Sequence, residues 1–130
     1  MFEVKNWVAI GLFLFGSTFL WMTRDFLADR RMGTGMVWSI VQVLVFVAIA
    51  GFAVAAWGVF KEASWWEASA LASAIVGVVA LIAYGIGIVQ VGDQGDAGVQ
   101  INIAVHVLGL AAVLAVVLLP AVHTWIDKRI

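Results

Sequence analysis

The sequence predicts an all-α integral membrane protein, in which four transmembrane helices form one domain with up-down antiparallel connections. Of its 130 residues, 65% are hydrophobic and 12% are charged, and its mean hydropathy is +1.10. An ordinary soluble domain is about half apolar and a quarter charged. Four stretches are long and apolar enough to cross a hydrocarbon layer of about 30 Å as helices. The charged residues lie between these stretches or at their ends, as expected where a central charge is costly.

The four predicted spans cover residues 6–23, 36–60, 64–91 and 98–126. We expect the first span to be retained rather than cleaved as a signal peptide, because Glu3 stands beside Lys5 and no clear small-residue cleavage site follows. The link at 24–35 is the longest. Its Phe26 and Leu27 among charged residues predict a short interfacial turn of helix, ended by glycines.

Cap and breaker residues define the last two spans. Ser64-Trp65-Trp66-Glu67 has the pattern of a capping box, which predicts that the third helix starts at this serine. The turn at 92–98 is rich in Gly and Asp, and Asp96 is the predicted N-cap of the fourth helix. Pro120 removes one backbone hydrogen bond and is expected to kink that helix near its end.

The tryptophans support these spans independently, because each lies near the end of a predicted span. There the indole ring meets lipid while its N–H reaches water. The predicted interfacial anchors are Trp7, Trp21, Trp38, Trp57, Trp65, Trp66 and Trp125.

The composition also excludes several classes of function. A net charge of −1 leaves no basic surface for nucleic acid, and the absence of cysteine excludes disulfides and thiolate metal sites. No Ser/His/Asp set, paired carboxylates within a span, H-E-x-x-H motif or phosphate-binding loop occurs in the sequence. We therefore expect no catalytic activity and no metal site.

Orientation in the membrane is weakly encoded. Lys5, Lys61, Lys128 and Arg129 fall on the side of the N-terminus, and Arg24, Arg30 and Arg31 fall on the opposite side. The positive-inside rule does not decide between four basic residues and three. Either a partner or the insertion machinery sets the orientation, or copies insert both ways and form an antiparallel dimer.

Polar side chains within the spans gather in the half of the membrane away from the N-terminus. They are Ser17, Thr18, Gln42, Tyr84, Gln90, Gln100, Asn102 and His106. Two faces stand out. Asn102, His106, Gly109 and Val113 share one face of the fourth span, and Ser73, Gly77, Ala80, Tyr84 and Gly87 form a stripe of mostly small residues on the third.

Two interpretations of these polar residues stay open. Gln42, Tyr84, Asn102 and His106, with Gln90 nearby, are candidates for a pocket that holds a quinone head group, an ion or a small polar substrate. The alternative, which we favour, is that they join helices through interhelical hydrogen bonds worth about 1 kcal/mol each. None carries a permanent charge of the kind that coupled transport commonly uses.

We expect no cofactor, although His106 leaves haem or quinone as an unfavoured alternative. The only other histidine, His123, lies about 25 Å further along the same span. One chain therefore cannot supply two haem ligands at matched depth, and haem would require two copies of His106 across a dimer axis.

These observations predict a small non-catalytic accessory or structural subunit of a larger membrane complex. Its expected partners are the bilayer and other membrane subunits or further copies of itself, and short loops with much Ala, Val and Gly suggest a prokaryotic cytoplasmic membrane. The alternatives are a homo-oligomeric channel or small transporter with a polar pocket in one leaflet, and a quinone- or haem-binding redox subunit.

Overall fold

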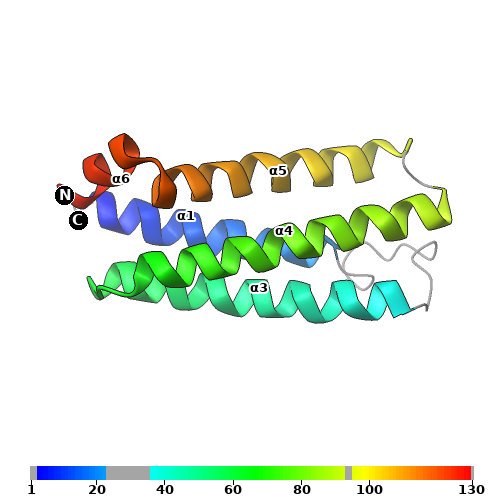
Figure 1. Ribbon diagram of the computed structural model, residues 1–130, viewed down its shortest axis with the longest axis horizontal. Coiled ribbons are helices and arrows are strands. Elements are labelled where there is room, and N and C mark those ends of the chain that lie inside the picture. The colour runs from blue at the N-terminus through cyan, green and yellow to red at the C-terminus, as the bar shows by residue number, and fades with distance from the viewer. Residues whose placement is uncertain (1–2, 23–35, 93–94, 130) are drawn as a thin grey trace.

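The chain forms a bundle of long helices in the computed structural model, which describes residues 3–22, 36–92 and 95–129 (Figure 1). The predicted interfacial segment at 24–35 lies outside this part of the chain. No strand occurs in the described ranges. The elements in order are α1 (Val4–Thr18), the 3₁₀ turn η1 (Phe19–Met22), α3 (Met36–Phe60), α4 (Trp66–Val91), α5 (Ala97–Leu118) and α6 (Pro120–Asp127).

The predicted fold class is confirmed. Within the described ranges, four segments are long and apolar enough to cross a membrane: Val4–Met22, Met36–Phe60, Trp66–Gln90 and Ala97–Leu118. Consecutive long helices run in opposite directions, and the N- and C-terminal ends lie at the same end of the bundle (Figure 1). The protein is therefore an integral membrane protein built as an up-down antiparallel bundle.

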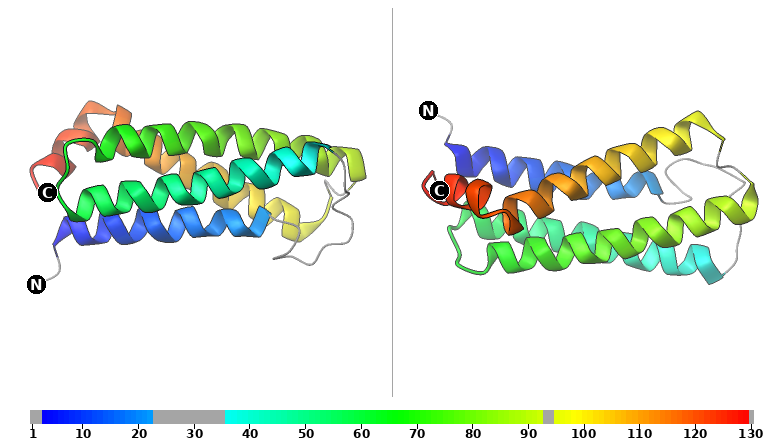
Figure 2. Two further views of the ribbon diagram at one scale, coloured as in Figure 1. Left: turned by 90° about the horizontal axis from the view of Figure 1, so that it is seen from below. Right: turned by 45° about the horizontal axis from the view of Figure 1, so that its top comes forward.

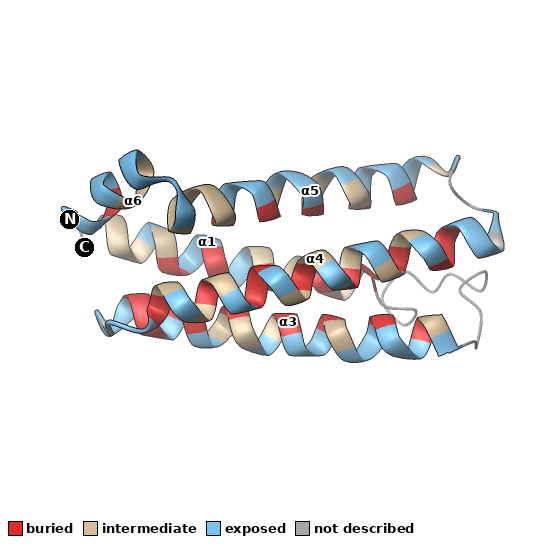
Figure 3. Cartoon of the chain, viewed as in Figure 1, coloured by how far each residue is buried: buried red, intermediate tan, exposed pale blue. Residues whose placement is uncertain are grey.

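The outer face of the bundle is apolar. Phe13 of α1, Val43 of α3 and Leu108 of α5 are 54%, 62% and 69% exposed. Buried residues face the inside of the bundle along each long helix, and exposed residues cover the outside (Figure 3). A surface this rich in large apolar side chains is suited to lipid rather than to water.

The packing is uneven around the bundle. α3 packs extensively against both α4 and α1, whereas α5 packs mainly on α4 and touches α1 very little. α5 also crosses the other helices obliquely (Figure 2). The face of α3 that fills the interior consists of residues spaced alternately by four and three positions: Val41, Val45, Ala48, Phe52, Ala55 and Val59.

Small residues let the helices approach one another closely. The whole predicted stripe on α4 is buried, from Ser73 through Gly77, Ala80 and Tyr84 to Gly87. A Cβ added to Gly87 would lie 2.8 Å from the indole ring of Trp38 on α3. These helices therefore pack through small residues, as is common in membranes, where apolar burial from water does not drive association.

Replacement of Gly16 by alanine is expected to destabilise the contact between α1 and α3 by about 1–3 kcal/mol. A Cβ at Gly16 would lie 2.5 Å from the Cβ of Phe52, and an atom next to the backbone cannot swing away. Gly11→Ala is a matched control in the same helix, because no atom lies within 4 Å of its added Cβ. SDS-induced unfolding of both variants in mixed micelles checks the difference. Equal midpoints would contradict the close approach.

The predicted N-cap of the fourth span is confirmed. The Asp96 side chain accepts a hydrogen bond of 3.1 Å from the backbone N–H of Val99, and α5 begins at the next residue, Ala97. At the other end of this connection, Gly92 ends α4 in a left-handed conformation with φ +76°, which glycine adopts without steric cost.

The predicted capping box at Ser64 is wrong. α4 begins at Trp66, and its N-cap is Trp65, with no side-chain capping hydrogen bond. A tight turn precedes the helix, in which the Trp66 N–H donates to the Ala63 carbonyl at 3.2 Å. Both tryptophans also pack against Gly58, where an added Cβ would lie 2.8 Å from each. This packing, rather than the serine hydroxyl, fixes where the helix starts.

Pro120 breaks the last span instead of kinking it. α5 ends at Leu118, Leu119 is extended with φ −81° and ψ 118°, and Pro120 is the first residue of α6. Proline disfavours the helical conformation for the residue before it, and it fits the first turn of a helix, where its missing N–H is not needed. The predicted span at 98–126 is therefore a long helix followed by a separate short one.

The tryptophans divide into two groups. Trp7, Trp57, Trp65 and Trp125 are between 45% and 63% exposed, so they lie on the outer face as expected for interfacial anchors, and Trp21 is partly buried. Trp38 and Trp66 are only 8% and 6% exposed. These two fill space between helices, and the anchor interpretation does not fit them.

Candidate functional site

A buried polar cluster joins three helices in the half of the bundle away from the termini. Thr18 comes from α1, Tyr84 from α4, and Asn102 and His106 from α5. Tyr84 and His106 are fully buried, and Asn102 is 4% exposed. Polar groups in such surroundings must find partners inside the protein, because lipid supplies none.

Asn102 is the centre of the cluster. Its side-chain N–H₂ donates to the backbone carbonyl of Trp21 at 3.1 Å and to the Tyr84 hydroxyl oxygen at 3.2 Å. The carbonyl of Trp21 can only accept, which identifies the amide nitrogen and so fixes the amide orientation. The other amide atom, Oδ1, is buried and has no hydrogen-bond partner in the described part of the chain.

His106 is held at both ring nitrogens. Nδ1 lies 2.7 Å from the Asn102 backbone carbonyl and must therefore donate a hydrogen. Nε2 lies 3.3 Å from the Thr18 hydroxyl oxygen, which also lies 2.6 Å from the Phe15 carbonyl. The single hydroxyl hydrogen of Thr18 can serve either the carbonyl or Nε2, but not both at once.

Aromatic rings enclose the imidazole of His106. The ring of Phe19 meets it edge-on at 4.6 Å, and the ring of Phe15 lies 6.0 Å away, both measured between centroids. Haem ligation needs an open ring nitrogen and, in this protein, a second copy of His106. Because both nitrogens have partners and the side chain is fully buried, the residues present do not fit a haem.

The structure brings together three of the five predicted pocket residues. Tyr84, Asn102 and His106 form the cluster together with Thr18. The sequence predicted the depth of Thr18 in the membrane but not its place in this cluster. The side chains of Gln42 on α3 and Gln90 on α4 are exposed on the outer face of the bundle. They take no part in the cluster. The predicted pocket of Gln42, Tyr84, Asn102 and His106 is therefore wrong, because Gln42 does not face the other three.

An apolar groove lies between α1 and α5, towards the end of the bundle that holds the termini. Its volume is about 270 Å³, and it is partly open. Its walls are formed by Val8, Gly11, Leu12, Phe15, Trp66, Ala70, Gly109, Ala112, Val113, Val116 and Val117. Phe15 also contacts His106, so this residue borders both the groove and the polar cluster.

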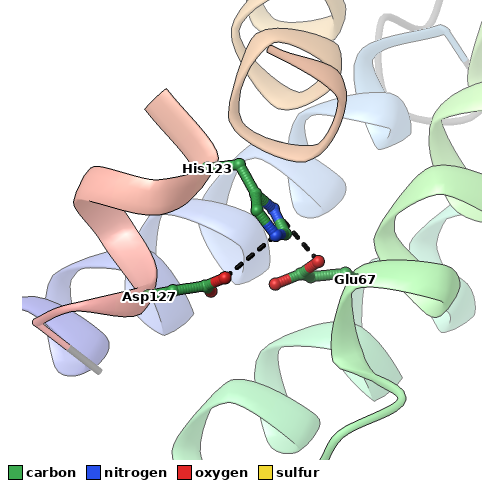
Figure 4. Close-up of side chains that lie close together, drawn as sticks. All are labelled: Glu67, His123 and Asp127. Carbon is green, nitrogen blue, oxygen red and sulfur yellow. Dashed lines mark ion pairs between the residues drawn. The ribbon is translucent and has the colours of Figure 1, made fainter. Parts of the chain in front are cut away.

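A second polar cluster, which sequence reasoning missed, lies at the end of the bundle that holds the termini (Figure 4). Nδ1 of His123 lies 3.1 Å from a carboxylate oxygen of Glu67, and Nε2 lies 2.9 Å from a carboxylate oxygen of Asp127. His123 and Asp127 are four residues apart on α6, and Glu67 belongs to the first turn of α4. We call these three residues the interfacial triad.

Comparison with known proteins gives no indication of function: no protein-family model, curated protein or solved structure matches the chain.

Proposed function

We propose that the protein is a small non-catalytic subunit that binds a transmembrane helix of another membrane protein, within a complex of a prokaryotic cytoplasmic membrane. The groove between α1 and α5 is the observation that carries this proposal. It exists because these two helices make few contacts with each other. A concave apolar surface of this kind suits a further helix better than a polar substrate.

The residues on the groove walls support a helical partner. Gly11 and Ala112 are small, exposed residues on these walls, and small residues allow helix backbones to approach closely in a membrane. Gly11 has no atom within 4 Å of the position where a Cβ would lie. Packing within the bundle therefore does not require a glycine at this position, whereas close approach of a helix from outside would favour one.

The polar cluster supports the same proposal because its side chains bond mainly to one another and to nearby backbone groups. The side chains of Asn102 and His106 form hydrogen bonds with elements of their own bundle, and neither residue lines the groove. This arrangement is suited to holding α5 in place against α1 and α4, since α5 packs little against α1 directly.

Photo-crosslinking in the native membrane tests the proposal. We expect a photoreactive side chain at Ala112, on the groove wall, to link the protein to one different membrane protein of defined mass. The same group at Val43, which is 62% exposed on α3, serves as the control and should give no such product. Gly11→Leu should fill the groove and remove the product while the isolated protein stays folded. Crosslinking only to lipid or to a second copy would contradict the proposal.

The unpartnered Oδ1 of Asn102 favours one alternative, a homo-oligomeric channel or small transporter. A buried acceptor without a donor is a place where water or the N–H or O–H group of a substrate can bind. Flux through liposomes that contain only the purified protein tests this alternative. Flux that Asn102→Ala abolishes, with no loss of helical content, would favour transport over the subunit proposal.

A further inference from the structure

The interfacial triad brings two carboxyl groups and an imidazole close together. A neutral imidazole carries one N–H, yet both nitrogens of His123 lie within hydrogen-bonding distance of a carboxylate oxygen, at 3.1 and 2.9 Å. The second of these contacts therefore needs either a further proton within the triad or a cation that the three side chains share.

We propose that the interfacial triad binds a divalent transition-metal ion, with Zn²⁺ as the representative of this class. One ligand atom from each of Glu67, His123 and Asp127 lies within 4.8 Å of the other two. Three ligands around one ion come somewhat closer than this, so small side-chain rotations complete the site. One nitrogen of His123 then binds the ion, and the other turns to solvent.

The donor set selects this class of ion. One imidazole nitrogen with two carboxylates suits zinc and its first-row neighbours, whereas calcium and magnesium prefer oxygen ligands only. Two carboxylates and a neutral imidazole carry a charge of −2, which a divalent ion neutralises. This balance matters at the edge of a membrane, where uncompensated charge is costly.

The surroundings leave the site available. The side chains of Glu67, His123 and Asp127 are 27%, 33% and 45% exposed, so an ion can enter with water on its remaining positions. Three basic residues near this end have partners outside the triad: Lys5 pairs with Glu3 and Glu62, Lys61 lies over Trp57, and Arg129 lies over Trp125. In the described part of the chain, both carboxyl groups of the triad contact the imidazole of His123.

The fold also explains why these ligands meet. The break at Leu119 redirects the chain, so that α6 presents its i and i+4 residues to the first turn of α4. The site shares no residue with the groove, and its assignment does not depend on the proposed subunit role.

Calorimetric titration of the full chain tests the assignment. The protein is treated with EDTA, placed in nanodiscs of zwitterionic lipid and titrated with ZnCl₂, and with MgCl₂ for comparison. We expect one saturable zinc site per chain and no comparable magnesium binding. His123→Gln, Glu67→Gln and Asp127→Asn should each weaken zinc binding about tenfold or more. Glu3→Gln removes an acidic residue from the same end of the bundle and should leave the affinity unchanged.

Cobalt gives a second, spectroscopic readout. Co²⁺ bound by the three side chains should show visible absorption that His123→Gln removes, with circular dichroism confirming that the variant is folded. Absence of saturable zinc binding would overturn the proposal. Equal zinc affinity in the parent and His123→Gln proteins would overturn it as well.

Discussion

Replacement of Phe52 by alanine is expected to lower the free energy of unfolding by about 2–4 kcal/mol. Phe52 is fully buried in the middle of α3 and contacts α1 directly. Its ring meets that of Phe15 edge-on at 5.4 Å and stacks on that of Phe19 at 5.9 Å. Lipid replaces water around the unfolded helices, so the loss arises mainly from van der Waals contacts and from the cavity left behind.

Phe46→Ala is the matched control for this variant, because Phe46 lies on the same helix and is 49% exposed. Its replacement should change the stability by less than about 0.5 kcal/mol. SDS-induced unfolding in mixed micelles, followed by circular dichroism, measures both variants. A similar loss in the two proteins would show that α3 does not present the face described above to the bundle interior.

Replacement of His106 by alanine is expected to lower the stability by about 2–3 kcal/mol. The change removes a fully buried ring that packs edge-on against Phe19. It also removes the polar contacts of the ring with the Asn102 carbonyl and the Thr18 hydroxyl. The same unfolding measurement checks this result, and Leu108→Ala, at a position 69% exposed on α5, is the control.

A double-mutant cycle with Thr18→Val separates the packing of His106 from its hydrogen bonding. If the contact between Nε2 and the hydroxyl is stabilising, the two substitutions together should cost less than the sum of their separate effects. Strict additivity would show that the 3.3 Å contact contributes nothing measurable and that His106 acts through packing alone.

The fold could be predicted from the sequence because lipid imposes constraints that are visible in composition. Length, apolarity and the placement of charges define the four spans without reference to packing. Asp96 was predictable for a similar reason, since its cap depends on local geometry alone. Ser64 was not, because the start of α4 depends on the packing of Trp65 and Trp66 against Gly58, which the local pattern does not contain.

The candidate site could be predicted only in part, because sequence shows the depth of a residue more readily than its direction. Gln42 lies at the right depth but follows Val41, a buried residue, by one position and so points about 100° away from it. Since both faces of α3 are apolar, no periodic contrast revealed which one is buried. Asn102 and His106 were easier to place, because two polar residues four positions apart define a face by themselves.

The interfacial triad did leave a signal in the sequence. His123 and Asp127 have helical i, i+4 spacing after a proline, and Glu67 opens a span on the same side of the membrane. The sequence pattern did not show that these residues meet, because their contact depends on the break at Leu119. A continuous or gently kinked helix would not be expected to present the same face to α4.

This break also limits how much of the chain must be accommodated by the bilayer. A single helix from Ala97 to Asp127 would be roughly 46 Å long at 1.5 Å per residue, well beyond a hydrocarbon layer of about 30 Å. Such an excess is relieved by tilting or kinking of the helix or by local thickening of the membrane. Because α5 ends at Leu118, just before the proline, its length is about 33 Å, which matches an ordinary bilayer. The residues of α6 therefore do not have to lie within the hydrocarbon layer.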